Sequence, residues 1–142
     1  MADAPTNAGT VQCIVVTPEA TELDRSADFV ALPLYDGEYG VAPGHSPVIG
    51  RLGYGELRLR RGTQELRYYV DGGFVQIADN VVSVLTNRAI PADKTNEAAA
   101  SAQLEAAQGR RAAGDEQIAI RDRLVKQARG QLRVSARSGP QD

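Results

Sequence analysis

The spacing of hydrophobic residues changes near residue 90, so the two parts of the chain are expected to fold differently. Up to about Asn87, short apolar segments alternate with polar residues, and Gly, Pro or Asn interrupts them every eight to twelve residues. This pattern is typical of the strands of a sandwich or barrel. The expected strands are residues 11–16, 29–32, 55–60, 66–70, 73–77 and 81–85, with a tight hairpin turn at Asp79-Asn80.

Beyond Pro91 the pattern becomes helical. Residues 95–108 are rich in alanine and contain neither Gly nor Pro, which favours a helix that ends at Gly109. A second helix is expected from Asp115, a favoured N-cap residue, to about residue 134. Two helices joined by a short linker form an antiparallel hairpin. The apolar stripe of the second helix recurs every seven residues, at Ile118, Val125 and Leu132.

The hairpin carries few large apolar side chains with which to hold the rest of the chain. Burying a Leu or Ile side chain contributes about 1.5–3 kcal/mol, whereas ordering each backbone residue costs about 1–2 kcal/mol. We therefore expect a hairpin that forms but docks weakly. The predicted organisation is a disordered tail over 1–9, an all-β sandwich or barrel over 10–90, the helical hairpin over 91–137 and a disordered tail over 138–142.

Formal charge divides the chain in a similar way. Residues 1–92 carry seven basic and eleven acidic side chains, whereas residues 110–137 carry eight basic and three acidic ones. Such a basic helix could bind nucleic acid or an acidic protein surface. Its arginines are not interleaved with aromatic residues, and acidic residues interrupt them, so the pattern argues against nucleic acid.

Few residues of the chain are suited to catalysis or metal binding. One cysteine and one histidine are too few for a structural zinc site. Cys13 lies in an expected strand and is interpreted as a buried residue, not as the nucleophilic partner of His45. Asp36 and Glu38 are expected to be solvated, and no Gly-Lys phosphate loop, signal peptide or membrane span is recognised. We expect no catalytic residues, no metal and no cofactor.

Residues 36–47 have the composition of a functional loop. They contain three glycines, two prolines and the only histidine of the chain. This composition does not favour a regular strand, and an elaborate loop between strands is often a working loop.

Several short motifs follow one another in a specific order between Val11 and Val134. They are Thr17-Pro18-Glu19, Val30-Ala31-Leu32-Pro33, Gly37-Glu38-Tyr39-Gly40-Val41 running into Pro43-Gly44-His45-Ser46-Pro47, Gly55-Glu56-Leu57, Val70-Asp71-Gly72-Gly73-Phe74-Val75, Asn80-Val81-Val82-Ser83-Val84-Leu85 and Gln131-Leu132-Arg133-Val134. As a set, they resemble the epsilon subunit of F-type ATP synthases.

The resemblance implies a β-sandwich of about ten strands in two sheets, followed by a helical hairpin. It also implies a non-catalytic subunit of the central stalk, which binds the gamma subunit and rests on the ring of membrane c subunits. Residues 36–47 would face that ring. The implied contact residues are Asp36, Glu38, Tyr39 and His45, with Glu38 making a polar contact and His45 stabilising the turn or touching the rotor.

In this family the hairpin can fold against the sandwich or extend toward the catalytic alpha and beta subunits, where it inhibits ATP hydrolysis. The residues expected to pair with an acidic segment of beta are Arg121, Arg123, Arg129 and Arg133. Some members bind ATP through a motif like Leu-Asp-x-x-Arg-Ala. This chain has Asn96 and Ala99 at the Asp and Arg positions, so we expect weak or no ATP binding.

The resemblance places the protein in a proton-translocating complex, on the cytoplasmic face of the bacterial plasma membrane. It would be a peripheral protein there, without inserting into the membrane itself. The residues alone also allow an alternative, a free-standing ligand-binding β-sandwich with a coiled-coil hairpin for oligomerisation.

Overall fold

The computed structural model of the protein describes residues 9–137. The tails predicted over 1–9 and 138–142 lie outside this range, apart from Gly9. The strands are β1 (Val11–Val16), β2 (Thr21–Ala27), β3 (Phe29–Leu34), β4 (Gly37–Val41), β5 (Val48–Arg61), β6 (Gln64–Ala78), β7 (Val81–Leu85) and β8 (Ala89–Pro91). They are followed by a 3-10 turn η2 (Ala92–Lys94) and the helices α1 (Glu97–Gln108) and α2 (Asp115–Arg137).

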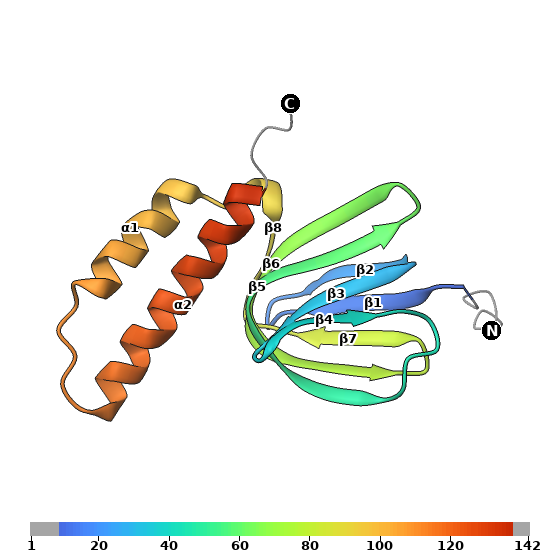
Figure 1. The fold of residues 1–142 in the computed structure, drawn as a ribbon, viewed down its shortest axis with the longest axis horizontal. Helices are drawn as coiled ribbons and strands as arrows, with labels where there is room; N and C mark the ends of the chain where they lie inside the picture. The colour runs from blue at the N-terminus through green and yellow to red at the C-terminus, as the bar shows by residue number, and fades with distance from the viewer. Residues whose placement is uncertain (1–8, 138–142) are drawn as a thin grey trace.

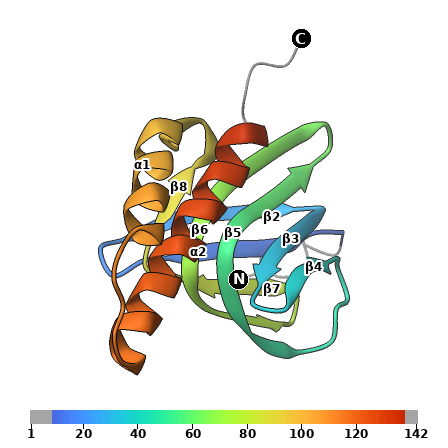
Figure 2. The ribbon, with the colours of Figure 1, turned by 60° about the vertical axis from the view of Figure 1, so that its left-hand side comes forward.

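The described strands form one hydrogen-bonded sheet that folds over itself as a sandwich, with the helical hairpin to one side (Figure 1). The strand order is β2-β1-β7-β6-β5-β3-β4, and β8 pairs with β6. All pairs are antiparallel except β1 with β7. The predicted fold is confirmed, with eight strands rather than about ten. The count is lower because β5 and β6 are long and curve continuously around the sandwich (Figure 2).

Strict alternation of buried and half-buried residues in β1 shows how the core forms. Val11, Cys13 and Val15 are buried, and the residues between them lie on the outer face. The predicted hairpin turn between β6 and β7 is confirmed, since Asp79 and Asn80 have φ values of 52° and 62°. Two positive φ values are what a tight hairpin turn of this type requires.

Cys13 is fully buried, and burial, assisted by the charge of Asp24, raises the pKa of its thiol to about 12. Only the thiolate reacts readily with disulfide reagents. We predict that, at pH 8, Cys13 reacts at least about 100-fold more slowly in the folded protein than in urea. Absorbance after adding a chromogenic disulfide reagent measures both rates. Equal rates would contradict the burial of Cys13.

The expectation that residues 36–47 contain no regular strand is wrong. Gly37–Val41 forms β4, which pairs antiparallel with β3. Pairing with a neighbouring strand overrides the weak local preference of these residues. Gly40 has a packing reason as well, because a Cβ atom there would lie 2.6 Å from Cζ of Phe29. Strand β2 was also missed, since this mostly polar edge strand buries only Leu23 and Ala27.

The helices begin and end close to the predicted residues. The side chain of Asn96 caps α1 by accepting a hydrogen bond of 2.9 Å from the backbone N–H of Ala99. The predicted apolar stripe of α2 is only partly correct, because Ile118 is exposed. Only the C-terminal half of α2 approaches the sandwich, and the other half projects away from it (Figure 1). The buried residues of α2 are Ala128, Gly130, Gln131 and Val134.

Candidate functional site

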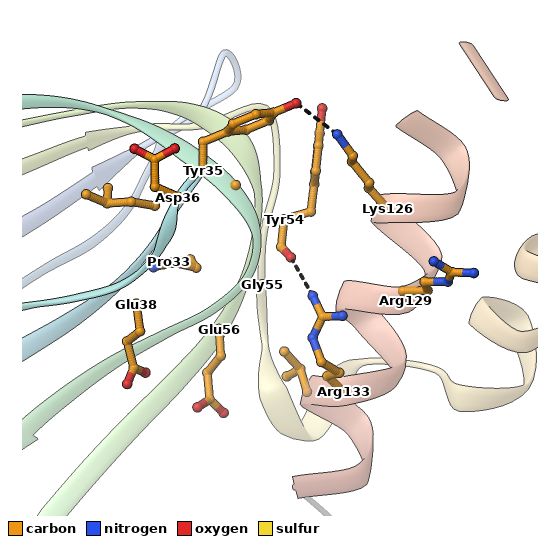
Figure 3. A pocket seen from close by; sticks show the side chains of 14 residues that line it. Pro33, Tyr35, Asp36, Glu38, Tyr54, Gly55, Glu56, Lys126, Arg129 and Arg133 are labelled. Carbon is orange, nitrogen blue, oxygen red and sulfur yellow. Dashed lines mark hydrogen bonds between the residues drawn. The ribbon is translucent and has the colours of Figure 1, made fainter. Parts of the chain in front are cut away.

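The turn between β3 and β4 lies beside α2, and its acidic residues are exposed (Figure 3). Asp36 is at the turn, and Glu38 starts the return along β4. The carboxylate of Glu38 is 3.0 Å from the guanidinium of Arg58, and 58% of its side chain is accessible. Arg58 therefore orients Glu38 while leaving most of its surface open to a partner.

Tyr39 and His45, farther along the chain, bind each other. The Tyr39 hydroxyl lies 2.9 Å from Nε2 of His45, and Nδ1 of His45 lies 2.7 Å from the carbonyl oxygen of Ser46. Because a carbonyl oxygen only accepts, Nδ1 donates to Ser46, and in the neutral ring Nε2 accepts from Tyr39. Both side chains are half-buried, and Tyr39 packs against the main core. This pair thus fixes the loop after β4.

Helix α2 contacts the same turn through Lys126. Its ammonium donates a hydrogen bond of 2.8 Å to the hydroxyl of Tyr35 and lies 4.8 Å from the centre of the tyrosine ring (Figure 3). The guanidinium of Arg51 lies 4.2 Å from that ring centre. The hydrogen bond from Lys126, with the charges of Lys126 and Arg51, lowers the pKa of Tyr35. Beside this contact is an open pocket of about 630 Å³ between the turn and α2.

A second contact joins α2 to the strand β5. Arg133 donates a hydrogen bond of 3.2 Å to the backbone carbonyl of Tyr54, as Figure 3 shows. Val134 is buried in a small cluster with Tyr69 and Ala92, against which Tyr54 and Ile90 pack. This cluster is distinct from the main core of the sandwich. The hairpin therefore rests on a small apolar contact supplemented by polar bonds.

The buried carboxylate of Asp71 connects β6 with α2. Its oxygens accept hydrogen bonds from the Tyr69 hydroxyl (2.6 Å) and the Gln127 amide (3.2 Å). Arg88 lies 3.5 Å from the same carboxylate. Burial, followed by the hydrogen bond to Asp71, raises the pKa of Tyr69, so Tyr69 stays a neutral donor. A buried charge is tolerated only when it is paired in this way.

A group of large apolar side chains is exposed on the outer surface of the sheet. Ile49, Phe74 and Leu85 are 78%, 59% and 55% exposed. Phe74 pairs directly with Leu85 across β6 and β7, and Ile49 lies on the adjacent strand β5. Contiguous exposed apolar side chains are unusual on a monomeric surface and mark contact sites. We call these three residues the outer apolar face.

Comparison with known proteins identifies the family. Residues 10–92 match the model of the β-sandwich domain of the ATP synthase delta/epsilon chain. The ATP synthase epsilon chain of Rhodopirellula baltica is 55% identical over 125 residues, which cover 88% of this chain and 98% of that protein. The chain belongs to the ATP synthase epsilon family. A Synechococcus epsilon chain is 34% identical over 92% of this chain and 96% of its own length.

Solved structures agree with the epsilon fold. A chain of the Euglena gracilis mitochondrial ATP synthase, in an assembly of OSCP, F1 and c ring, superposes with a TM-score of 0.76. It is 21% identical, and the match covers 86% of this chain and 79% of that one. A chain from the central stalk and c ring of Tetrahymena thermophila gives a TM-score of 0.69 at 12% identity, over 88% and 96%. At these identities the matches support the fold alone.

The four arginines predicted to act in this epsilon chain fall into two groups. Arg129 and Arg133 line the pocket beside the sandwich, and Arg133 is bonded to it. Arg121 and Arg123 lie on the projecting half of α2, where Arg121 is 3.9 Å from Asp122. The docked hairpin therefore engages Arg133, whereas Arg121 and Arg123 stay away from the sandwich.

Several residues of the docking contact were not predicted from the sequence. Tyr35, Asp71 and Lys126 are the main examples, although Asp71 gave one signal, a charged residue within an apolar strand pattern. No helix within residues 9–137 is long and apolar enough to cross a membrane.

Proposed function

We propose that this epsilon chain is a non-catalytic stalk subunit that binds gamma through the outer apolar face. The exposed side chains of Ile49, Phe74 and Leu85 carry this proposal, because burying each one fully would contribute about 1.5–3 kcal/mol. The hairpin packs at Tyr54 and Tyr69, away from these three residues. Gamma could therefore bind while the hairpin stays docked. Family membership favours this function over a free-standing ligand-binding sandwich.

The sheet suits the transmission of force between two partners. Strands β5 and β6 are paired from Val48 with Ile77 to Arg61 with Gln64, with no register shift. A ladder that keeps one register on a close-packed core resists deformation. A load applied at the β3–β4 turn would thus reach the outer apolar face through hydrogen-bonded strands.

We further propose that the β3–β4 turn rests on the c ring of a proton-translocating complex. Asp36 and Glu38 are exposed there, and Arg58 holds Glu38 in one orientation. Exposed carboxylates of this kind suit polar or basic side chains in a loop of the ring. The partners would hold the chain peripherally at the cytoplasmic face of the bacterial plasma membrane, without inserting it.

The hairpin would regulate ATP hydrolysis by leaving the sandwich and extending toward the alpha and beta subunits. In the docked state Arg133 is bonded to Tyr54 and Lys126 to Tyr35, so neither side chain is free for another partner. Extension would release both. Together with Arg121, Arg123 and Arg129, Arg133 could then pair with an acidic segment of beta.

We predict that this chain alone binds ATP weakly or not at all. Asn96 is occupied as the cap of α1, and Ala99 offers no charge for a phosphate. Loss of a guanidinium removes the strong charge-assisted bonds that phosphates prefer. Isothermal titration calorimetry with Mg-ATP should give no signal at submillimolar concentrations. A submillimolar dissociation constant would show that other residues make a nucleotide site.

Copurification with the gamma subunit tests the proposed function directly. Co-expression of both chains should yield a stable complex with one copy of each, seen by size-exclusion chromatography with light scattering. A stable homodimer that ignores gamma would count against a stalk subunit.

A further inference from the structure

Gly130 lies in the interior of α2, where a glycine has no local advantage. Glycine disfavours a helix interior relative to alanine, because it loses more backbone freedom. Its backbone does not require glycine either, since Gly130 is not among the residues with positive φ. The reason for this residue must therefore lie in its surroundings.

The surroundings leave no room for a side chain. A Cβ atom at Gly130 would lie 2.6 Å from the carbonyl oxygen of Tyr54, 3.0 Å from the carbon of that carbonyl and 3.2 Å from Cε1 of Tyr69. The closest of these atoms belongs to backbone, which cannot rotate away as the end of a side chain can. Tyr54 is also held in the β5–β6 ladder opposite Asp71. The helix can approach this closely only because residue 130 is glycine.

The position of this carbonyl follows from an interruption in the sheet. The register of β3 against β5 shifts between Ala31 and Leu34, where Pro33 has no N–H group to donate. The carbonyl of Tyr54 accepts instead from Arg133 of α2. Gly130 and Arg133 thus meet the same backbone group, one by close approach and one by a hydrogen bond.

The rest of the docking contact is small, so it cannot compensate for a displacement of α2 from the sheet. The open pocket of about 630 Å³ lies on one side of it, and α1 packs on α2 rather than on the sandwich (Figure 1). Bonds from Lys126 to Tyr35 and from Gln127 to Asp71 depend on the same separation of α2 from the sheet. A shift of a few tenths of an ångström at residue 130 would weaken all of these contacts together.

We propose that Gly130, by having no side chain, permits α2 to dock against β5 and sets the ratio of docked to undocked molecules. An alanine there would improve the helix and destabilise docking, two effects of opposite sign. Overpacking a tight contact usually destabilises it by more than replacing glycine by alanine stabilises a helix interior. We expect the loss of docking to be the larger effect. The G130A chain should therefore keep an intact hairpin that has left the sandwich. The expected undocking does not depend on the proposed function; only the expected effect of G130A on ATP hydrolysis rests on it.

Distances between spin labels in the full-length chain test this inference. Labels at Thr63→Cys and Glu116→Cys would occupy exposed positions on the sandwich and on the projecting half of α2. Cys13 needs no replacement because it is buried. In a background with Gly130 we expect one narrow distance distribution. G130A should reduce the ratio of docked to undocked molecules at least tenfold, with unchanged or higher helix content by circular dichroism.

Ala119→Gly is the matched control, since it weakens α2 at an exposed position without adding atoms to the contact. It should leave the distance distribution unchanged. An unchanged distribution in G130A, or a loss of its helix content, would overturn the inference. In a reconstituted catalytic complex, G130A should lower ATP hydrolysis. If the labels show undocking while hydrolysis stays the same, the inference about Gly130 holds and the proposed inhibitory role of the hairpin fails.

Discussion

Phe74→Asp is expected to weaken binding of this chain to gamma by at least about 30-fold. Phe74 is 59% exposed and lies against Leu85 in the outer apolar face. Truncating an anchor of an apolar interface costs at least about 2 kcal/mol, and each 1.4 kcal/mol is about a tenfold change in affinity. An unpaired carboxylate adds a desolvation cost. Surface-based binding measurements with purified gamma would give the ratio of dissociation constants.

The same substitution should hardly change the stability of the sandwich, because exposed positions tolerate substitution within about 0.5 kcal/mol. Ile118→Asp is the matched control, since Ile118 is also an exposed large apolar residue but lies on the projecting half of α2. It should bind gamma as the unmodified chain does. Equal losses in both variants, or none in either, would show that the outer apolar face is not the gamma contact.

Changing Arg121, Arg123, Arg129 and Arg133 to Gln together should raise ATP hydrolysis by the isolated catalytic complex by about fourfold or more. Each exposed ion pair contributes about 0.2–1 kcal/mol, so several must be lost before the effect is large. A steady-state assay of phosphate release measures the change. The increase should shrink as ionic strength rises, because salt screens exposed charges.

The structure sharpens this test by separating the arginines into two pairs. The double variant Arg121→Gln/Arg123→Gln should weaken inhibition without changing the docking of the hairpin. Within residues 9–137, neither side chain contacts the sandwich. Changing Arg133 also removes a hydrogen bond that holds the docked hairpin. Arg110→Gln/Arg111→Gln in the exposed connector is the charge-matched control and should have no effect. If an intact complex with all four Arg→Gln substitutions hydrolyses ATP at an unchanged rate, pairing of these arginines with beta is contradicted.

The predictable strands are those whose own residues determine their pairing. Val11–Val16 and Val81–Leu85 are apolar and β-branched, so their pattern alone located both. Strand β4 depends on pairing with β3, which overrides the preference of its glycines. Strands β5 and β6 are longer than the sequence predicts, because glycines within them interrupt the strand pattern. In the structure these glycines lie at close contacts, such as Gly55 against Pro33.

The candidate sites were predictable to the extent that they are local in the sequence. The resemblance implies that Asp36 and Glu38 lie in a contact loop; the structure places Asp36 at the β3–β4 turn and Glu38 at the start of β4, and both are exposed. The contact of Lys126 with Tyr35 joins residues 91 positions apart, and no local pattern encodes such a pair. From the sequence alone, Gly130 indicates only a locally weaker helix, because the reason for this glycine is a carbonyl group of another element.

The separation of the two hydrophobic clusters has a consequence for how such a gene can change over generations. The main cluster contains no residue beyond Ala89, and the cluster under the hairpin is small. A shortened descendant ending near Lys94 would keep its whole main core and expose little more than the surfaces of Tyr54 and Tyr69. Selection can therefore lengthen, reshape or delete the last third of the chain while the sandwich stays under its own, stricter constraint.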